Sequence, residues 1–181
     1  MILFRAGGGA GPSGGGPLGL GQEAGSPQEG GERPEREPSR PERQREMTLE
    51  EMLDDLPSVC DWGTKGKSGR KHYWRGYKLR VDWADGEIPV SALPTSASVH
   101  DSQAAIPLAV MSAARVESLY DLMDAGYDAE TIRAHSRSLG HVPIIDVRPR
   151  SGVKAEWEPA LKRRYDERTA AERGFSRRFA C

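Results

Sequence analysis

One carboxylate in this sequence occupies a position where a charge is costly. Six side chains recur at three- and four-residue spacing near the C-terminus, so a helix there would place them on one face: Leu161, Tyr165, Arg168, Glu172, Phe175 and Phe179. Because four of the six are apolar or aromatic, this face is expected to turn toward a core, where Glu172 would need a cation or metal. Two simpler alternatives stay open: a salt bridge to Arg168 one turn earlier, or a helix rotated so that Glu172 meets water.

A second carboxylate, Asp124, follows residues 116–123, a mostly apolar run typical of a buried strand. The break at Ala125-Gly126 places Asp124 at the carboxyl edge of a sheet, where open α/β sheets bind ligands. Together with Glu172 it could hold two divalent metals, which activate water and stabilise the leaving oxygen in phosphodiester cleavage. The alternative is that Asp124 caps a turn.

A third feature is a basic segment with interleaved aromatic residues. Its cations are candidates for binding DNA phosphates, and such binding weakens with salt: Lys65, Lys67, Arg70, Lys71, Arg75 and Lys78. Tyr73, Trp74 and Tyr77 lie among them. The alternative is a solvated loop that protects a sheet edge from aggregation.

These residues need a sheet and helices to position them. The pattern predicts strands at 74–83 and 88–96 joined through Asp85-Gly86, a strong hairpin signal. It then predicts a helix from about Asp101 with a bend or break at Pro107, the strand 116–123, a helix at 129–139 ending at Gly140, the strand 142–146 and a long final helix. A short helix near 48–56 precedes them. The order indicates an α/β domain.

Composition divides the chain in two. Residues 1–46 hold more than half of the 21 glycines and end in a Pro/Glu/Arg run at 32–46, so they are expected to form a disordered tail or linker. Residues 47–181 are expected to fold. The 26 Lys and Arg nearly balance the 27 Asp and Glu. Two distant cysteines without a metal-binding pattern, and no signal-peptide or membrane-spanning segment, favour a reducing cytoplasm and no membrane partner.

Several segments carry a family resemblance. HYWRGYKLRVD, TSASVHDSQAAIPL, LYDLMDAGYDA, VPIID and RYDERTAAERGF resemble the catalytic core of bacterial insertion-sequence transposases of the DDE type. That family has an Asp-x-x-Tyr-Asp context, matched here from Asp124 to Asp128. Its Tyr-x-x-Arg-x-x-x-Glu signature is matched by Tyr165, Arg168 and Glu172, whereas the later lysine position is Phe179.

The resemblance implies a ribonuclease H-like mixed sheet flanked by helices and the function of DNA transposition. By this likeness Asp124 and Glu172 would be catalytic ligands of two Mg²⁺ ions, and Tyr165 and Arg168 would position a phosphate of the transposon end. The implied partners are transposon ends, target DNA and a second copy of the chain. The implied location is the cytoplasm, in association with the nucleoid.

The family's first catalytic aspartate has no clear counterpart. It should stand on a first, central strand upstream of the 32–46 run, where this sequence offers only a glycine-rich segment. Asp61 imitates its context but lies downstream of that run, and Gly63 weakens a strand there. An active enzyme in which Asp61 supplies the third ligand is a further alternative. We therefore expect an amino-terminally truncated transposase with impaired activity, a sheet without its first central strand, and a hairpin that stays apart from strand 116–123. Residues 57–62 could fill the gap instead. The alternatives are an inactive DNA-binding remnant and a small α/β interaction domain without catalysis.

Overall fold

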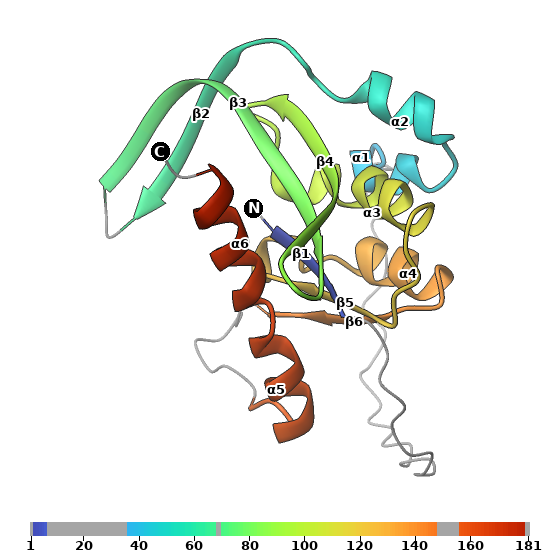
Figure 1. Ribbon diagram of the computed structural model, residues 1–181. Coiled ribbons are helices and arrows are strands. Elements are labelled where there is room, and N and C mark those ends of the chain that lie inside the picture. Colours follow the sequence, from blue (N-terminus) through green and yellow to red (C-terminus); the bar gives the residue numbers. More distant parts are fainter. Residues whose placement is uncertain (1, 7–35, 68–69, 148–155, 180–181) are drawn as a thin grey trace, which may run out of the picture.

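The computed structural model describes residues 2–6, 36–67, 70–147 and 156–179 (Figure 1). Its strands form one mixed sheet in the order β2-β3-β1-β5-β6, with β4 paired to β3 outside this path. The strand bounds are β1 Ile2–Ala6, β2 Asp61–Lys67, β3 Arg70–Ala84, β4 Ile88–Ser96, β5 Tyr120–Met123 and β6 Val142–Ile145. The helices are α1 Arg40–Gln44, α2 Leu49–Asp55, α3 Ala105–Ala113, α4 Glu130–Ser138, α5 Pro159–Asp166 and α6 Thr169–Phe179, with short 3-10 turns η1 Asp101–Ala104 and η2 Ala125–Tyr127.

Strand β3 is the long element around which the sheet is built. Its first half pairs with β2 and its second half with β4, both antiparallel. The predicted Asp85-Gly86 turn joins β3 to β4, and Gly86 has a φ of 79°, a conformation that glycine adopts without steric cost. The predicted strand 88–96 is confirmed. The first strand begins four residues earlier than expected, because the basic segment pairs with β2 instead of forming a loop.

The centre of the sheet is filled from the amino terminus. Strand β1 lies between β3 and β5, parallel to β3 and antiparallel to β5, with Phe4 in register with both Trp83 and Leu122. The expected gap is therefore closed, by residues 2–6 and not by 57–62. The physical reason is that β3 and β5 each present backbone donors and acceptors that are costly to bury unpaired, and a short apolar run can satisfy both rows.

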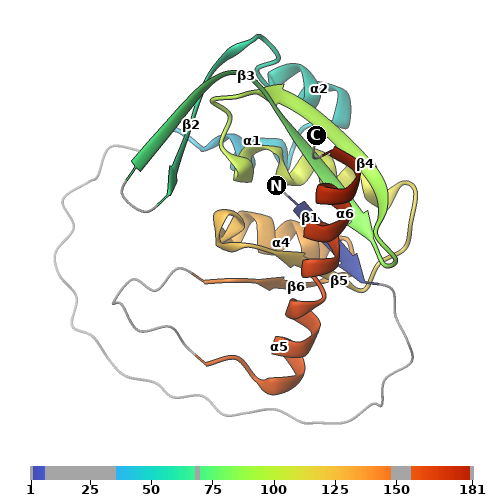
Figure 2. The same ribbon diagram turned by 60° about the vertical axis from the view of Figure 1, so that its left-hand side comes forward.

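Helices cover both faces of the sheet, as Figures 1 and 2 show. On the side of α2, α3 and α4, a core cluster includes Leu108, Met123 and Tyr127. On the side of α5 and α6, a second cluster includes Trp83 and Ala171. This three-layer arrangement agrees with the predicted α/β class.

The expectation that residues 1–46 hold no regular structure is wrong at 2–6 and at 40–44; the part of it that concerns 7–35 falls outside the described residues. Helix α1 begins after Ser39, whose hydroxyl and backbone N–H both donate to Glu42, each over 2.6 Å. Gln44 is fully buried and donates to the carbonyl of Gln103 over 2.8 Å. A capping signal and one buried contact thus attach the charged run to the domain.

The final helix is broken in two. Glu167 and Arg168 separate α5 from α6, and the Thr169 hydroxyl donates to the carbonyl of Asp166 over 2.7 Å. The amides of Ala170 and Ala171 bond to carbonyls three residues back, which is the tighter 3-10 pattern. The single continuous stripe predicted from 161 to 179 is therefore wrong: Tyr165 and Phe175 both pack against the second cluster, but Glu172 between them is exposed. Pro107, by contrast, causes no break: it lies in the first turn of α3, where its missing N–H has little cost.

Candidate functional site

A cleft of about 510 Å³ lies between the β2–β3 ribbon and the carboxyl end of β5. It is lined by Thr64, Lys65, Trp74, Lys78, Leu79, Arg80, Asp101 and Asp124. Three of these side chains are cationic and two are carboxylates. The sheet thus brings the predicted basic segment and one predicted catalytic residue, far apart in the sequence, to one surface.

Asp124 lies where the sequence predicted, directly after β5. Its Oδ1 accepts a hydrogen bond from the backbone N–H of Gly126 over 2.8 Å, so it caps the turn η2. A Cβ added to Gly126 would lie 2.8 Å from the same oxygen, and a glycine at this position lets the turn close on Asp124. One oxygen of Asp124 therefore caps the turn, as the alternative interpretation predicted, and the residue also lines the cleft.

Glu172 does not face the core. It lies in the first turn of α6, its side chain is 52% exposed, and its Oε1 is 2.8 Å from a guanidinium nitrogen of Arg168. The core-facing interpretation is wrong, and both simpler alternatives hold: Glu172 pairs with Arg168 and meets water. The break between α5 and α6 is the physical reason, since it turns α6 away from the continuous stripe.

Tyr165 and Arg168 lie together at the junction of α5 and α6. The Tyr165 ring stacks on Trp157 with centroids 5.0 Å apart, and the Arg168 guanidinium lies 5.4 Å from the centre of the Tyr165 ring. Burial raises the pKa of Tyr165, Arg168 lowers it, and the negative charges of Asp146 and Asp124 raise it further. The junction therefore lies within the electrostatic field of the carboxyl edge of β5 and β6.

Asp146 is an acid at this edge that the sequence analysis did not single out. Its backbone N–H donates to the carbonyl of Met123 over 3.1 Å, and the paired strands put Ile145 in register with Met123. Asp146 is thus the neighbour of Asp124 on the next parallel strand. The signal was present in the sequence, because an aspartate directly follows each of these strands.

Beneath the cleft, a buried polar cluster fixes its floor. Arg80 is 1% exposed and bonds to the hydroxyl of Thr95, to the carbonyl of Val99 over 2.6 Å and to Asp101 over 3.1 Å. Burial raises the pKa of Tyr127 well above its usual value, and the nearby negative charges of Asp101 and Asp124 add to the rise. The hydroxyl of Tyr127 therefore stays protonated in the folded protein.

The described residues do not assemble a metal site. Among them, no three His, Cys, Asp or Glu side chains are placed so that they could hold an ion together. Asp61 does not supply a third ligand: it begins β2, away from the central strand, and its carboxylate accepts from the backbone and hydroxyl of Ser98. These hydrogen bonds lower the pKa of Asp61. The residue therefore has a structural role at the base of the ribbon.

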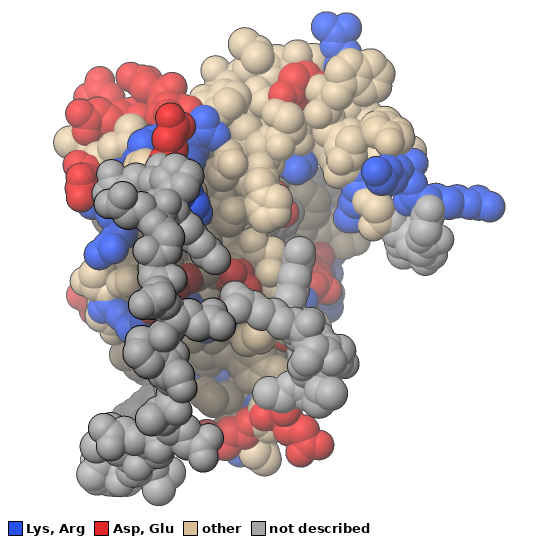
Figure 3. Space-filling model, turned by 180° about the vertical axis from the view of Figure 1, so that it is seen from behind, with Lys and Arg blue, Asp and Glu red and all other residues tan. Residues whose placement is uncertain are grey.

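The β2–β3 ribbon carries all six cations of the basic segment. Figure 3 shows Lys and Arg gathered where this ribbon projects from the body, opposite the acidic surface of α2. Lys65, Arg70, Lys71 and Arg75 are exposed and Lys78 is partly buried, while the backbone of Lys67 lies in β2. The predicted basic surface thus belongs to a paired ribbon beside the cleft.

The chain from 37 to 179 matches the family model described as Transposase DDE domain. This chain belongs to the transposase DDE-domain family. The match covers most of the sequence, including the ribbon, Asp124 and Glu172. It confirms the resemblance to DDE transposases and, with the mixed sheet between two helical layers, the ribonuclease H-like fold. No curated protein and no solved structure matches this transposase domain. No helix in the described ranges of the domain is long and apolar enough to cross a membrane.

Replacing one glycine of the transposase domain's ribbon should lower the stability of the fold. A Cβ added to Gly63 would lie 2.4 Å from Trp74 and 2.9 Å from Ala97, whereas one added to Gly66 would contact nothing within 4 Å. We expect Gly63→Ala to displace the Trp74 ring and to lower the free energy of unfolding by about 1 to 3 kcal/mol. Gly66→Ala is the matched control and should leave stability nearly unchanged. Urea unfolding of both variants, followed by tryptophan fluorescence, measures the difference; equal midpoints would show that Trp74 does not pack on Gly63.

Proposed function

We propose that this chain acts on transposon and target DNA as the DDE domain of an insertion-sequence transposase, binding through the β2–β3 ribbon, and that its cleavage and strand-transfer activity is impaired. The observation that carries the proposal is the cleft in which Lys65 and Lys78 stand beside Asp124, above the buried Arg80. Cations beside a carboxylate at a sheet edge suit a DNA backbone held next to a reacting phosphate.

Within this proposal the predicted residues keep separate roles. The DNA-binding residues are Lys65, Lys67, Arg70, Lys71, Arg75 and Lys78, with Tyr165 and Arg168 at the helix junction. Arg168 can bond a phosphate in a bidentate way, and the Tyr165 hydroxyl can donate to one phosphate oxygen. Two copies of the chain would assemble on the DNA ends, in the cytoplasm beside the nucleoid.

Impairment follows from the carboxylates present. The family generally depends on divalent metals, and Asp124 and Glu172 are the proposed Mg²⁺ ligands. Strand β1 fills the central position but reads ILFRA, so its described residues include no acid. Glu172 is paired with Arg168, and the Oδ1 of Asp124 accepts the hydrogen bond that closes its turn. This donor set does not fit a two-metal site, and we derive no metal-dependent step from it.

We expect the purified chain with Mg²⁺ to nick a supercoiled plasmid carrying the element's ends no faster than its Asp124→Asn variant. The reason is that two carboxylates, each already engaged, cannot fix two metal ions. Gel analysis of plasmid conversion over time provides the measurement, and Glu172→Gln serves as the matched variant. Nicking that requires Mg²⁺ and disappears in both variants would show the chain to be an active enzyme.

Binding provides the second half of the test. The same two variants should bind duplex DNA as tightly as the parent chain, because neither carboxylate is needed to hold phosphates. A chain that neither binds DNA nor cleaves it would favour the remaining candidate, an α/β interaction domain without catalysis.

A further inference from the structure

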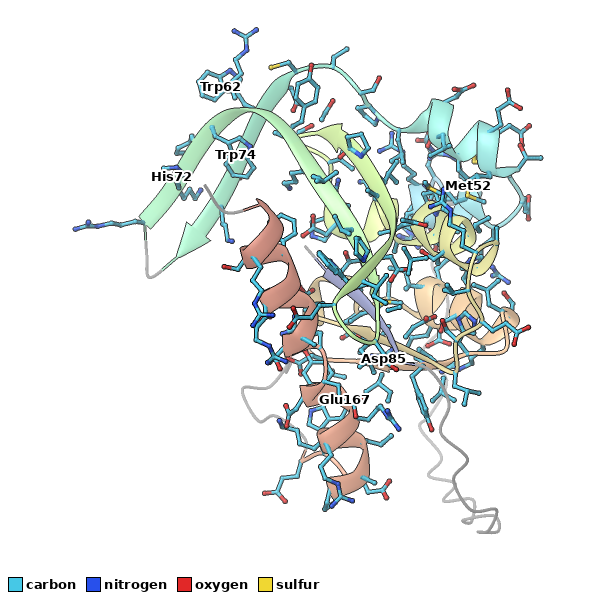
Figure 4. All side chains as sticks on the ribbon, viewed as in Figure 1. Met52, Trp62, His72, Trp74, Asp85 and Glu167 are labelled. Atoms are coloured by element: carbon cyan, nitrogen blue, oxygen red, sulfur yellow. The ribbon has the colours of Figure 1, made fainter. Side chains whose placement is uncertain are left out.

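The β2–β3 ribbon has two faces of different chemistry. Trp74 lies over Gly63 on the cleft side, and the Lys78 ammonium is 5.9 Å from the centre of the Trp74 ring, so residues 74 and 78 share that side. Side chains alternate along a strand, so residues 73, 75 and 77 point the other way. Trp62 is in register with Arg75 and therefore joins them. In Figure 4, Trp62 and Trp74 point to opposite sides of the ribbon.

The face turned away from the cleft, called here the outer face, includes Trp62, Lys71, Tyr73, Arg75 and Tyr77. Its three aromatic residues are exposed: Trp62 by 64%, Tyr73 by 56% and Tyr77 by 57%. Within the described ranges, none of the three rings stacks on another ring. Large aromatic side chains gathered on one exposed surface mark a binding site more often than chance exposure.

The charge of the outer face is of one sign. Lys71 and Arg75 lie between and beside the rings, and within the described chain neither forms an ion pair. The nearest ribbon carboxylate, Asp61, is in register with Gly76 and so belongs to the opposite side, where Ser98 holds it. These unpaired cations lie among exposed aromatic rings. Such a surface is complementary to a ligand that carries both negative charges and planar rings.

We propose that the outer face binds single-stranded DNA, with unpaired bases stacked on Trp62, Tyr73 and Tyr77 and phosphates bound by Lys71 and Arg75. This inference rests on the proposed function, because it takes DNA as the ligand. A duplex does not fit the rings, since its base faces are already stacked on one another. Same-side positions two residues apart on a strand are about 7 Å from each other, a spacing that an extended, unpaired strand can follow.

A second copy of the chain fits this face less well. A two-fold interface would bring identical surfaces together, and Lys71 and Arg75 would meet the same cations without a carboxylate between them. The proposed place of the outer face in the reaction is therefore the unpaired stretch of a transposon end, next to the duplex that the ribbon binds.

The test measures binding of the full 181-residue chain to a fluorescent oligothymidylate of about 12 nucleotides, and to a duplex of the same length, by fluorescence anisotropy. The triple variant Trp62→Ala, Tyr73→Ala, Tyr77→Ala should lose at least about tenfold in affinity for the single strand, because each stacked base contributes separately. Its affinity for the duplex should change by less than about twofold, since the cations that bind phosphate remain.

The matched control replaces the same three residues by Phe, which keeps the rings and should keep most of the single-strand affinity. Loss of single-strand affinity in the Ala variant with retention in the Phe variant supports the inference. Equal single-strand affinity in the parent and the Ala variant overturns it. The inference also fails if the Ala variant sediments as a monomer, the parent sediments as a dimer and both bind DNA equally, because the face would then bind a second copy. If the parent binds neither form of DNA, the proposed function itself fails; if it binds the duplex alone, only this inference fails.

Discussion

Trp83→Ala should lower the free energy of unfolding by about 3 to 5 kcal/mol, the largest stability effect expected from a single substitution in this chain. Trp83 is fully buried in β3 and belongs to the core between the sheet and α6. A Cβ added to Gly174 would lie 2.8 Å from the Trp83 ring, so α6 packs directly on this side chain. Truncation would leave a cavity under α6, and the helix that carries Glu172 would lose an apolar contact with the sheet. Urea unfolding followed by circular dichroism measures the loss.

Two variants make this result interpretable. Trp62→Ala removes the same side chain from a position that is 64% exposed, and it should change stability by less than about 0.5 kcal/mol. Trp83→Phe keeps a ring in the core and should lose less than Trp83→Ala. Equal destabilisation by Trp62→Ala and Trp83→Ala would contradict the placement of α6 on the sheet.

Raising the salt concentration from about 50 to about 200 mM should weaken duplex DNA binding roughly a thousandfold, if all six ribbon cations contact phosphates. The cause is that each phosphate contact releases a condensed counterion, so the logarithm of the binding constant falls with the logarithm of salt at a slope of about −0.9 per contact. The exposure of Lys65, Arg70, Lys71 and Arg75 makes them accessible to DNA. Anisotropy titrations of a labelled duplex at several salt concentrations give the slope.

Removing two of these charges gives the decisive comparison. The Arg70→Ala, Lys71→Ala double variant should reduce the slope by about two, one for each lost contact. Arg137→Ala is the control, because Arg137 lies on α4 and pairs with Glu130 over 2.7 Å, away from the ribbon. If the double variant kept the parent's slope while Arg137→Ala changed it, the DNA surface would lie on α4 and not on the ribbon.

Local patterns were sufficient to predict much of the fold. Alternating residues and the Asp85-Gly86 turn predicted β4 at its observed bounds, and Gly140 marked the end of α4 through its φ of 79°. The order of residues around Asp124, Tyr165, Arg168 and Glu172 predicted the family, because a family motif is defined by residue types and their spacing along the sequence. The helix that begins at the capping pair Ser39 and Glu42 was not predicted, because the composition of 32–46 indicated a linker.

Three features of the fold were not predicted from the sequence. The place of β1 between β3 and β5 follows from backbone pairing, which a run of five residues cannot reveal by itself. The break at Glu167 and Arg168 divides a stripe whose periodicity alone indicated one helix. The two faces of the ribbon were hidden because the basic residues form one cluster in sequence and separate only when β2 and β3 pair.

The sequence by itself determined the family, the order of most elements and the residue types available for chemistry, since these depend on composition and spacing along the chain. The tertiary structure alone decided that Glu172 pairs with Arg168 at the surface, that Asp61 is held by Ser98 outside the centre of the sheet, and that Asp146 stands beside Asp124. The physical reason is that the environment of a carboxylate is set by neighbours brought from other elements, and spacing within one element does not specify them.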